Sequence, residues 1–145
     1  LGLTDPEGGS SALMYGIHLD AGELVNHVHL VPSVEYWNVG NDVAQYNSDL
    51  SDLAFRLGVN FDFPLQDQRM VPYLGGGIGL HRFSFDTNVP GVDSSSDTKL
   101  GLDFQGGARN QFTPNLSLFG ELGYSFVSDA NQLRLLGGLT YHFIY

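Results

Sequence analysis

The sequence predicts an all-β fold, an antiparallel up-and-down β-barrel of the transmembrane type in which eight strands are expected. Three observations support this prediction. Apolar and polar residues alternate with a period of two over most of the chain, which is typical of strands. The chain contains 19 Gly, 10 Phe and 7 Tyr, whereas only 15% of its residues are charged. No apolar stretch approaches the roughly 18 residues with which a helix crosses a bilayer.

Length, charge and cysteine content narrow the alternatives. The 145 residues suffice for one small barrel, so a single β-barrel domain over residues 1–145 is expected. The net charge of −10 argues against nucleic acid as a partner, because phosphate binding needs clustered Lys and Arg. The chain has no Cys and therefore no disulfide framework, which is compatible with the periplasm.

The alternation predicts seven complete strands. The clearest is segment 53–63, in which Phe55, Leu57 and Phe61 share one face while Arg56 lies on the other. A tilted strand crosses the hydrocarbon of a bilayer in about 9–11 residues, and this segment has that length. In order along the chain, the predicted strands cover residues 13–20, 28–37, 53–63, 70–85, 99–109, 116–126 and 133–145.

The first two of these strands carry aliphatic and aromatic residues on one face. Tyr15 and Ile17 lie on the apolar face of the first strand. In the second strand, Val34 and Tyr36 flank Glu35. Both segments therefore follow the same rule as segment 53–63.

The segment 70–85 combines large and very small side chains. Leu74 and Ile78 lie on its apolar face, whereas Tyr73 and His81 share the opposite face with glycines. The interior of an eight-stranded barrel is just wide enough to be filled by side chains, so inward glycines would make room for large neighbours. This predicts a filled barrel rather than a wide pore.

The last three strands repeat the pattern around single charges. Leu102 and Phe104 flank Asp103 in the fifth complete strand. The sixth strand alternates around Glu121, and the last strand ends on the aromatic Tyr145.

The connections differ in length, as expected for membrane-spanning barrels with long loops on one side and short turns on the other. Long polar loops are predicted at residues 38–49 and 86–98. Short turns are predicted at residues 20–26, 64–69, 113–115 and 128–131.

The polarity of the two strand faces indicates which face points inward. A soluble barrel would carry many charges on its outer face. Here the polar faces are poor in Lys and rich in Gly, and the spacing of their single charges would allow these charges to pair with one another. The apolar faces are long and have aromatic residues at their ends, as at Phe83 and Phe85. We therefore expect an inverted barrel, in which the apolar faces point outward and the polar faces point into the lumen. Its polar lumen network would comprise Glu35, Arg56, Tyr73, Asp103, Arg109, Glu121 and Arg134. Its lipid- or partner-facing wall would include Phe55, Leu57, Phe61, Leu102, Phe104, Leu118, Tyr141 and Phe143.

Three segments resemble the OmpA/OmpX-like outer-membrane β-barrel domain family. They are residues 30–37 (LVPSVEYW), 71–80 (VPYLGGGIGL) and 138–143 (GLTYHF). The resemblance covers nearly the whole chain. It implies an up-and-down antiparallel barrel in the outer membrane of a Gram-negative bacterium, with a periplasmic C-terminus and assembly through the terminal aromatic strand.

The N-terminus departs from this family pattern. Residues 1–3 would be the extracellular end of a first strand whose remainder is absent, and residues 4–11 would be the first outer loop. Seven strands would leave an unpaired edge, at a cost of several kcal/mol for each bare backbone group in lipid. Either upstream residues complete the strand or another copy of the chain fills the gap. The second case gives an alternative function, a self-assembling barrel subunit of an extracellular tube or filament with its apolar outer faces packed between copies.

No catalytic, cofactor-binding or metal site is expected. Ser84, His81 and Asp86 are close in sequence, but the alternation sends Ser84 and His81 to opposite faces, which disfavours a hydrolase triad. His27 and His29 could both reach one metal ion, yet no acidic companion completes a ligand set. The preferred interpretation is therefore interior hydrogen bonding of His18, His29, His81 and His142 and a turn position for His27.

We therefore expect an outer-membrane protein with a structural or surface-interaction role, and not an enzyme. Its partners would be outer-membrane lipid or lipopolysaccharide, toward which Arg82, the one charge on an apolar face, could extend its long stem. Other copies of the chain are the alternative partner, and a soluble barrel with a small apolar ligand inside is a weaker third candidate. The acidic loop 86–97 could bind Ca²⁺ weakly but lacks EF-hand spacing, so a solvated loop is preferred.

Overall fold

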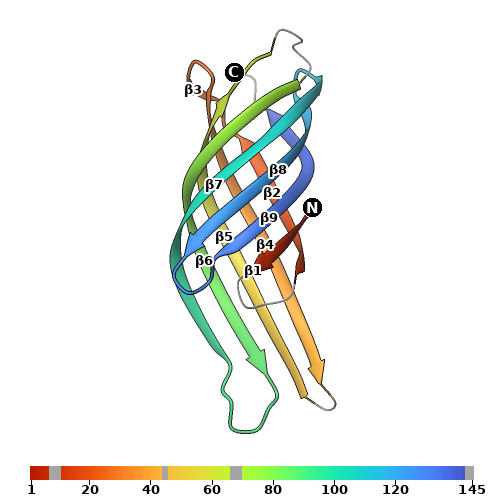
Figure 1. Ribbon diagram of the computed structural model, residues 1–145, viewed down its shortest axis with the longest axis vertical. Coiled ribbons are helices and arrows are strands. Elements are labelled where there is room, and N and C mark those ends of the chain that lie inside the picture. The colour runs from red at the N-terminus through yellow and green to blue at the C-terminus, as the bar shows by residue number, and fades with distance from the viewer. Residues whose placement is uncertain (7–10, 44–45, 66–69, 143–145) are drawn as a thin grey trace.

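The computed structural model describes residues 1–6, 11–43, 46–65 and 70–142 and contains nine strands within these ranges (Figure 1). None of these residues belongs to a helix that is long and apolar enough to cross a membrane. The strands are β1 (Gly2–Pro6), β2 (Ala12–Asp20), β3 (Glu23–Val25), β4 (Val28–Val43), β5 (Tyr46–Asp62), β6 (Met70–Thr87), β7 (Ser95–Thr113), β8 (Leu116–Val127) and β9 (Gln132–His142).

Eight of these strands close into an up-and-down barrel, while the short β3 only extends the pairing of β4. Leu3 of β1 pairs with Leu13 of β2 on one side and with Leu135 of β9 on the other, antiparallel in both cases. Where β1 no longer separates them, β2 and β9 pair directly and in parallel, with Leu19 opposite Tyr141. The predicted eight-stranded barrel is therefore confirmed, and the expected unpaired edge is closed within the described strands.

Two long hairpins, β4–β5 and β6–β7, extend far beyond the other strands at the end of the molecule away from the C-terminus (Figure 1). Pairing continues through these extensions, as between Val39 and Leu50 and between Ser84 and Ser96. β5 and β6 also pair there, as far as Ser48. The four extended segments therefore form one continuous sheet, which we call the protruding sheet.

The protruding sheet replaces most of the two long loops that were predicted. The predicted loop 38–49 is largely strand, because β4 runs to Val43 and β5 begins at Tyr46. Of the predicted loop 86–98, only residues 88–94 connect β6 to β7. Both predictions were wrong because polar residues on both faces hide the period of two, although the backbone still pairs.

The other connections are short. β7 ends at Thr113 and β8 begins at Leu116, so two residues connect them. Residues 128–131 connect β8 to β9, as predicted. The predicted turn at residues 20–26 instead contains β3, and residues 4–6 of the predicted first outer loop belong to β1. The predicted turn 64–69 lies partly outside the described residues.

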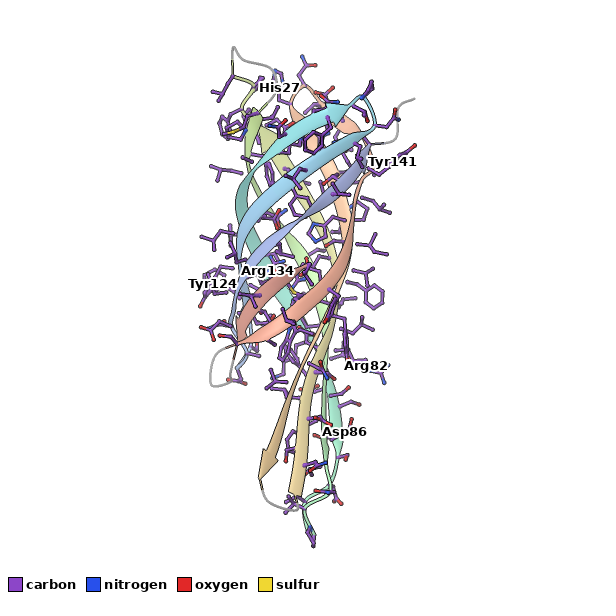
Figure 2. The ribbon with its side chains drawn as sticks, turned by 90° about the vertical axis from the view of Figure 1, so that its right-hand side faces the viewer. His27, Arg82, Asp86, Tyr124, Arg134 and Tyr141 are labelled. Atoms are coloured by element: carbon purple, nitrogen blue, oxygen red, sulfur yellow. The ribbon has the colours of Figure 1, made fainter. Side chains whose placement is uncertain are left out.

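The polarity of the barrel is inverted. Phe55 and Leu57 on the outer face are 52% and 48% exposed, whereas Arg56 between them is 7% exposed. Figure 2 shows side chains standing away from the wall around the barrel. A soluble barrel with an apolar interior is therefore not the structure of this chain.

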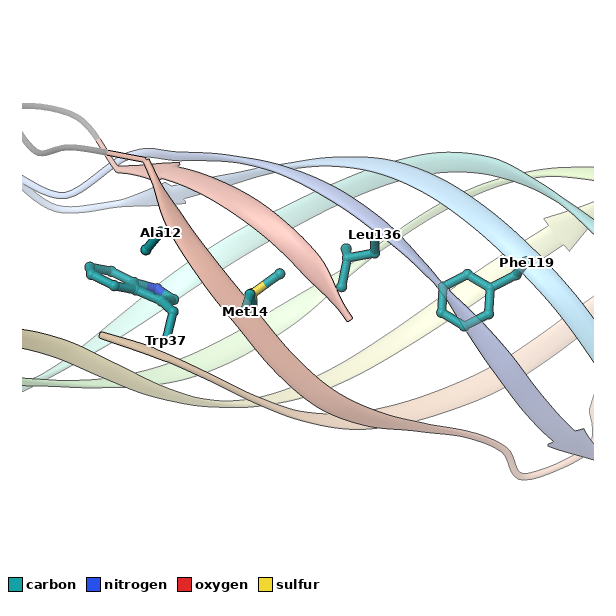
Figure 3. Packing of buried hydrophobic residues seen from close by; sticks show 5 residues of the cluster. All are labelled: Ala12, Met14, Trp37, Phe119 and Leu136. Carbon is teal, nitrogen blue, oxygen red and sulfur yellow. The ribbon is translucent and has the colours of Figure 1, made fainter. Parts of the chain in front are cut away.

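One apolar cluster nevertheless lies inside the barrel (Figure 3). Phe83 packs against this cluster, although Phe83 and Phe85 were predicted at the aromatic end of an outer face. That prediction was wrong: the alternation of β6 continues without a break, so both residues share the inward face of His81 and are half-buried. The cluster consists of Ala12, Met14, Trp37, Phe119 and Leu136.

Candidate functional site: the polar lumen and the protruding sheet

Two carboxylates and two guanidinium groups meet inside the barrel. Arg134 of β9 donates hydrogen bonds to Glu35 of β4 at 3.0 and 3.1 Å and to Asp103 of β7 at 3.4 Å. Arg56 of β5 donates to Asp103 through its Nε at 3.0 Å and also pairs with Glu35. Each of the four side chains is at most 7% exposed, so the charges are balanced by one another rather than by water. We call these four residues the central ion cluster.

A hydrogen-bonded chain lies beside this cluster, toward the protruding sheet. A hydrogen bond of 2.8 Å joins Nδ1 of His81 to Oδ2 of Asp52. The same carboxylate oxygen accepts a hydrogen bond from Gln132 at 3.0 Å, and Gln132 in turn accepts one from the indole N–H of Trp37 at 3.3 Å. Since Trp37 belongs to the apolar cluster, this chain connects the polar and apolar parts of the lumen.

Further ionisable groups line the opposite end of the lumen. Nδ1 of His142 lies 2.8 Å and Nδ1 of His29 lies 3.0 Å from Oδ2 of Asp20. Arg109 pairs with Asp62, whose carboxylate is 3.3 Å from Nε2 of His29. This group joins β2, β4, β5, β7 and β9, so it links the first strands of the barrel to the last one.

The seven residues predicted for the lumen all point inward. Four of them form the central ion cluster. Tyr73 donates a hydrogen bond of 2.9 Å to Glu121, which connects β6 to β8. Arg109 is only half-buried and belongs to the group around Asp20 and Asp62. The structure thus divides the predicted network into three separate groups.

Sequence reasoning missed several members of these groups. Asp52 and Asp62 lie on the same strand face as Arg56, at even spacings from it, so the alternation could have identified them. His18 was expected to form hydrogen bonds in the interior, and it lies 2.9 Å from Glu35, although the sequence alone did not show which residue would be its partner.

The outward-facing residues that were predicted lie on the outer wall. They are between 44% and 57% exposed. Phe143, which was also predicted there, lies outside the described residues. The exposed residues of this set are Phe55, Leu57, Phe61, Leu102, Phe104, Leu118 and Tyr141.

The residues considered for catalysis or metal binding do not come together. His81 is buried in the lumen, Ser84 faces outward, and Asp86 is exposed on the protruding sheet. His27 is exposed in a turn with φ of 65°, whereas His29 faces the lumen. Across the described ranges, no group of three or more His, Asp or Glu side chains has an arrangement that could hold a metal ion.

The protruding sheet has two edges that no described strand covers. β2 pairs with β4 only as far as Trp37, which leaves residues 38–43 of β4 without a neighbour on that side. β8 pairs with β7 only from Gly101 onward, which leaves residues 95–100 of β7 without a neighbouring described strand on that side. Exposed edges of this kind present unpaired backbone N–H and C=O groups.

Solved structures share this fold, among them the following three. Neisserial surface protein A (NspA) has a TM-score of 0.71 at 21% identity, over 95% of this chain and 88% of that one. Ail, the attachment invasion locus protein of Yersinia pestis, in complex with the heparin analogue sucrose octasulfate, has a TM-score of 0.63 at 16% identity, over 97% and 90% of the two chains. The N-terminal β-barrel domain of Pseudomonas aeruginosa OprF has a TM-score of 0.58 at 15% identity, over 95% and 90%. At these identities the likeness shows the fold alone.

Comparison at the level of sequence gives the family. A search of curated proteins finds no match. The outer membrane protein beta-barrel domain family matches residues 1–143, which is nearly the whole chain. The predicted resemblance and the predicted location are both confirmed: the chain belongs to the outer membrane protein β-barrel domain family and is a protein of the bacterial outer membrane.

Proposed function

We propose that the chain is a closed, non-conducting barrel without enzymatic activity, which holds the protruding sheet at the cell surface as an interaction surface. The observation that carries this proposal is the central ion cluster. Glu35, Arg56, Asp103 and Arg134 come from four different strands and meet across the lumen. Opening a water-filled path would require the separation of these buried ion pairs, each of which is expensive to break.

Conductance in planar bilayers tests the closed lumen. The purified barrel should insert without producing a steady single-channel current. A double variant, Arg56→Ala with Arg134→Ala, removes both cations of the cluster and should produce brief, irregular current steps if it folds. A stable channel in the unaltered protein would contradict the proposal.

The proposed interaction surface is the protruding sheet, and its chemistry favours a cationic, extended partner. Its uncovered edges offer backbone groups to which a partner segment could add as a further strand. The exposed acidic residues of this end outnumber the basic ones, since only Arg82 and Lys99 are basic among the described residues there. The structure of Ail contains a sulfated sugar analogue, which is a polyanion. A polyanion needs clustered cations, and this chain lacks them, so we do not propose such a ligand here. The exposed acidic residues of this end include Asp49, Asp86, Asp93, Asp97 and Asp129.

Binding of extended peptides in detergent solution tests this surface. A lysine-containing peptide with alternating apolar residues should bind more tightly than its glutamate counterpart, and added salt should weaken the binding. Asp49→Asn with Asp97→Asn should reduce it, whereas the control Glu23→Gln, at the opposite end of the barrel, should not. Equal binding of both peptides would contradict the proposed partner.

A further inference from the structure

The outward face of β6 changes its chemistry in a regular order toward the protruding sheet. Ile78 and Leu80 are exposed apolar residues, 51% and 52% accessible. The next outward residues are Arg82, then Ser84 and then Asp86. Figure 2 shows Arg82 projecting outward where the barrel passes into the protruding sheet, with Asp86 farther out. Arg82 therefore stands at the boundary of the apolar belt.

The neighbouring strands change in the same rows. Leu80 pairs with Phe55 of β5 and Leu100 of β7, so its row is apolar on all three strands. Arg82 pairs with Leu53 and Thr98. The row beyond Arg82 consists entirely of serines, namely Ser51, Ser84 and Ser96. An apolar surface, a cation and a set of hydroxyl groups thus follow one another over three strands.

The apolar part of this face is hollowed by a groove of about 230 Å³. Side chains from β5, β6 and β7 line it, and it reaches the row next to Arg82. Because it opens on the outer wall of a membrane barrel, lipid chains rather than water surround it. Its apolar lining consists mainly of Phe55, Leu57, Ile78, Leu80 and Leu100.

The guanidinium group of Arg82 has no partner among the described residues. The other Lys and Arg side chains within the described ranges are all engaged: three lie in the lumen, and Lys99 donates a hydrogen bond of 2.9 Å to the carbonyl of Ser128. Asp86 is four residues farther along an extended strand, about 13 Å away. That distance exceeds the Debye length at physiological salt, so the Asp86 carboxylate weakly opposes an anion bound at Arg82.

We propose that this face binds one anionic lipid of the outer leaflet. One acyl chain occupies the groove, and the phosphate of the headgroup lies against Arg82, whose planar fork matches phosphate geometry. The stem of Arg82 covers part of the apolar surface while its charged end reaches the headgroup level. Ser84, Thr98 and their neighbours supply hydroxyl donors around the headgroup. This proposal rests on the outer-membrane location and deepens the proposed function by specifying a lipid partner.

Native mass spectrometry of the detergent-solubilised barrel tests the site. The probes are phosphatidic acid and phosphatidylcholine with identical acyl chains, which differ in net headgroup charge. The unaltered barrel should retain one phosphatidic acid about fivefold more than phosphatidylcholine, the preference expected of one interfacial cation. Arg82→Gln should abolish this preference, whereas Arg82→Lys should keep most of it because the charge remains.

A second pair of variants tests the groove. Ile78→Trp should fill it and lower the retention of both lipids, whereas Leu122→Trp, at an exposed outward position of β8, should leave retention unchanged. Equal retention of the two lipids by the unaltered barrel, or a preference that survives Arg82→Gln, would overturn the lipid site. Heat-modifiable gel mobility of every variant shows whether it folds. Since Arg82 takes no part in the central ion cluster, the conductance test fails or succeeds independently of this result.

Discussion

Individual residues in the lumen are held by partners on other strands, and this makes their replacement costly. The central ion cluster pairs two cations with two anions in a space that water does not reach. In such a place the net gain from forming a pair is small, because both ions lose their hydration. Removing one partner is strongly destabilising, because the remaining charge stays buried without compensation.

Replacement of Arg134 by Met should therefore destabilise the barrel strongly. The change leaves Glu35 and Asp103 with one fewer cation, and we expect the free energy of unfolding to fall by about 3–5 kcal/mol. Urea titration in lipid vesicles, followed by gel mobility, measures the change. The matched control is Arg82→Met on the outer face, which should change the free energy by less than about 0.5 kcal/mol. Comparable losses in both variants would show that the cluster does not stabilise the lumen.

Two inward or wall glycines, Gly107 and Gly120, should differ in how well they tolerate a larger side chain. A Cβ atom at Gly107 would lie 2.3 Å from the carbonyl oxygen of Gly120 and 2.8 Å from the hydroxyl of Tyr73, whereas a Cβ at Gly120 would meet nothing within 4 Å. Gly107→Ala should lower the free energy of unfolding by about 1–3 kcal/mol. Gly120→Ala serves as the control and should be close to neutral. The same urea titration compares them, and a neutral Gly107→Ala would show that both the backbone at Gly120 and the Tyr73 side chain shift to accept the methyl group.

At the scale of strands, the sequence predicted the barrel wall well and its extensions poorly. The membrane-facing strands could be predicted because alternate residues have different surroundings. Apolar residues such as Phe55 face the lipid, and polar residues such as Arg56 face the lumen. Beyond the apolar belt this constraint ends. Asn38, Gly40 and Asp49 of the protruding sheet are exposed to water, so their composition resembles that of a loop.

The groups of the lumen were predictable only in part for a related reason. The alternation of apolar and polar residues predicts that Arg56, Asp103 and Arg134 point inward. It does not predict the register, that is, which residues of neighbouring strands lie opposite one another. Only the pairing of the strands shows that Arg56 and Arg134 contact both Asp103 and Glu35. Arg109, in contrast, lies with Asp20 at the far end of the lumen. The face of a residue is therefore a local property, and its partner is a property of the whole barrel.

Closure of the barrel through β1 can be tested with an engineered disulfide, since the chain has no Cys. Leu3 and Leu135 are direct partners in the β1–β9 pairing. Directly opposed residues of antiparallel strands have Cα atoms about 4.5–5.5 Å apart, within the range of a disulfide. Leu3→Cys with Leu135→Cys should form an intramolecular disulfide in the folded protein, seen as two protected thiols and a monomer on a non-reducing gel.

The control for this experiment places the second Cys one strand farther away. Leu122 of β8 pairs with Leu135 on the side away from β1, so Leu3 and Leu122 are separated by two strand spacings, about 10 Å. Leu3→Cys with Leu122→Cys should therefore keep both thiols free. Disulfide-linked dimers of the first variant would contradict closure within one chain and would favour the alternative of a self-assembling subunit.

The whole molecule combines three regions with different surroundings. An apolar belt faces lipid, the lumen holds buried ion pairs and an apolar cluster, and the protruding sheet carries acidic residues into water. The belt and the sheet share the same strands, β4 to β7, without a flexible joint between them. The sheet should therefore keep a fixed orientation relative to the membrane, which suits a surface that presents its edges to a partner.

The position of the single Trp provides a test of this arrangement as a whole. Trp37 is 1% exposed and lies in the lumen, so bromine atoms on lipid acyl chains should quench its fluorescence weakly, because they remain outside the wall. In the variant Trp37→Phe with Phe104→Trp, the new indole replaces a side chain that is 57% exposed on the outer wall, and the same lipids should quench it strongly. Trp37→Phe with Asn88→Trp, in the connection beyond β6, is the control for a water-exposed position and should respond to aqueous iodide instead. Strong quenching of Trp37 by brominated chains, together with weak quenching at position 104, would mean that the apolar faces point inward and that the chain does not span the membrane as described.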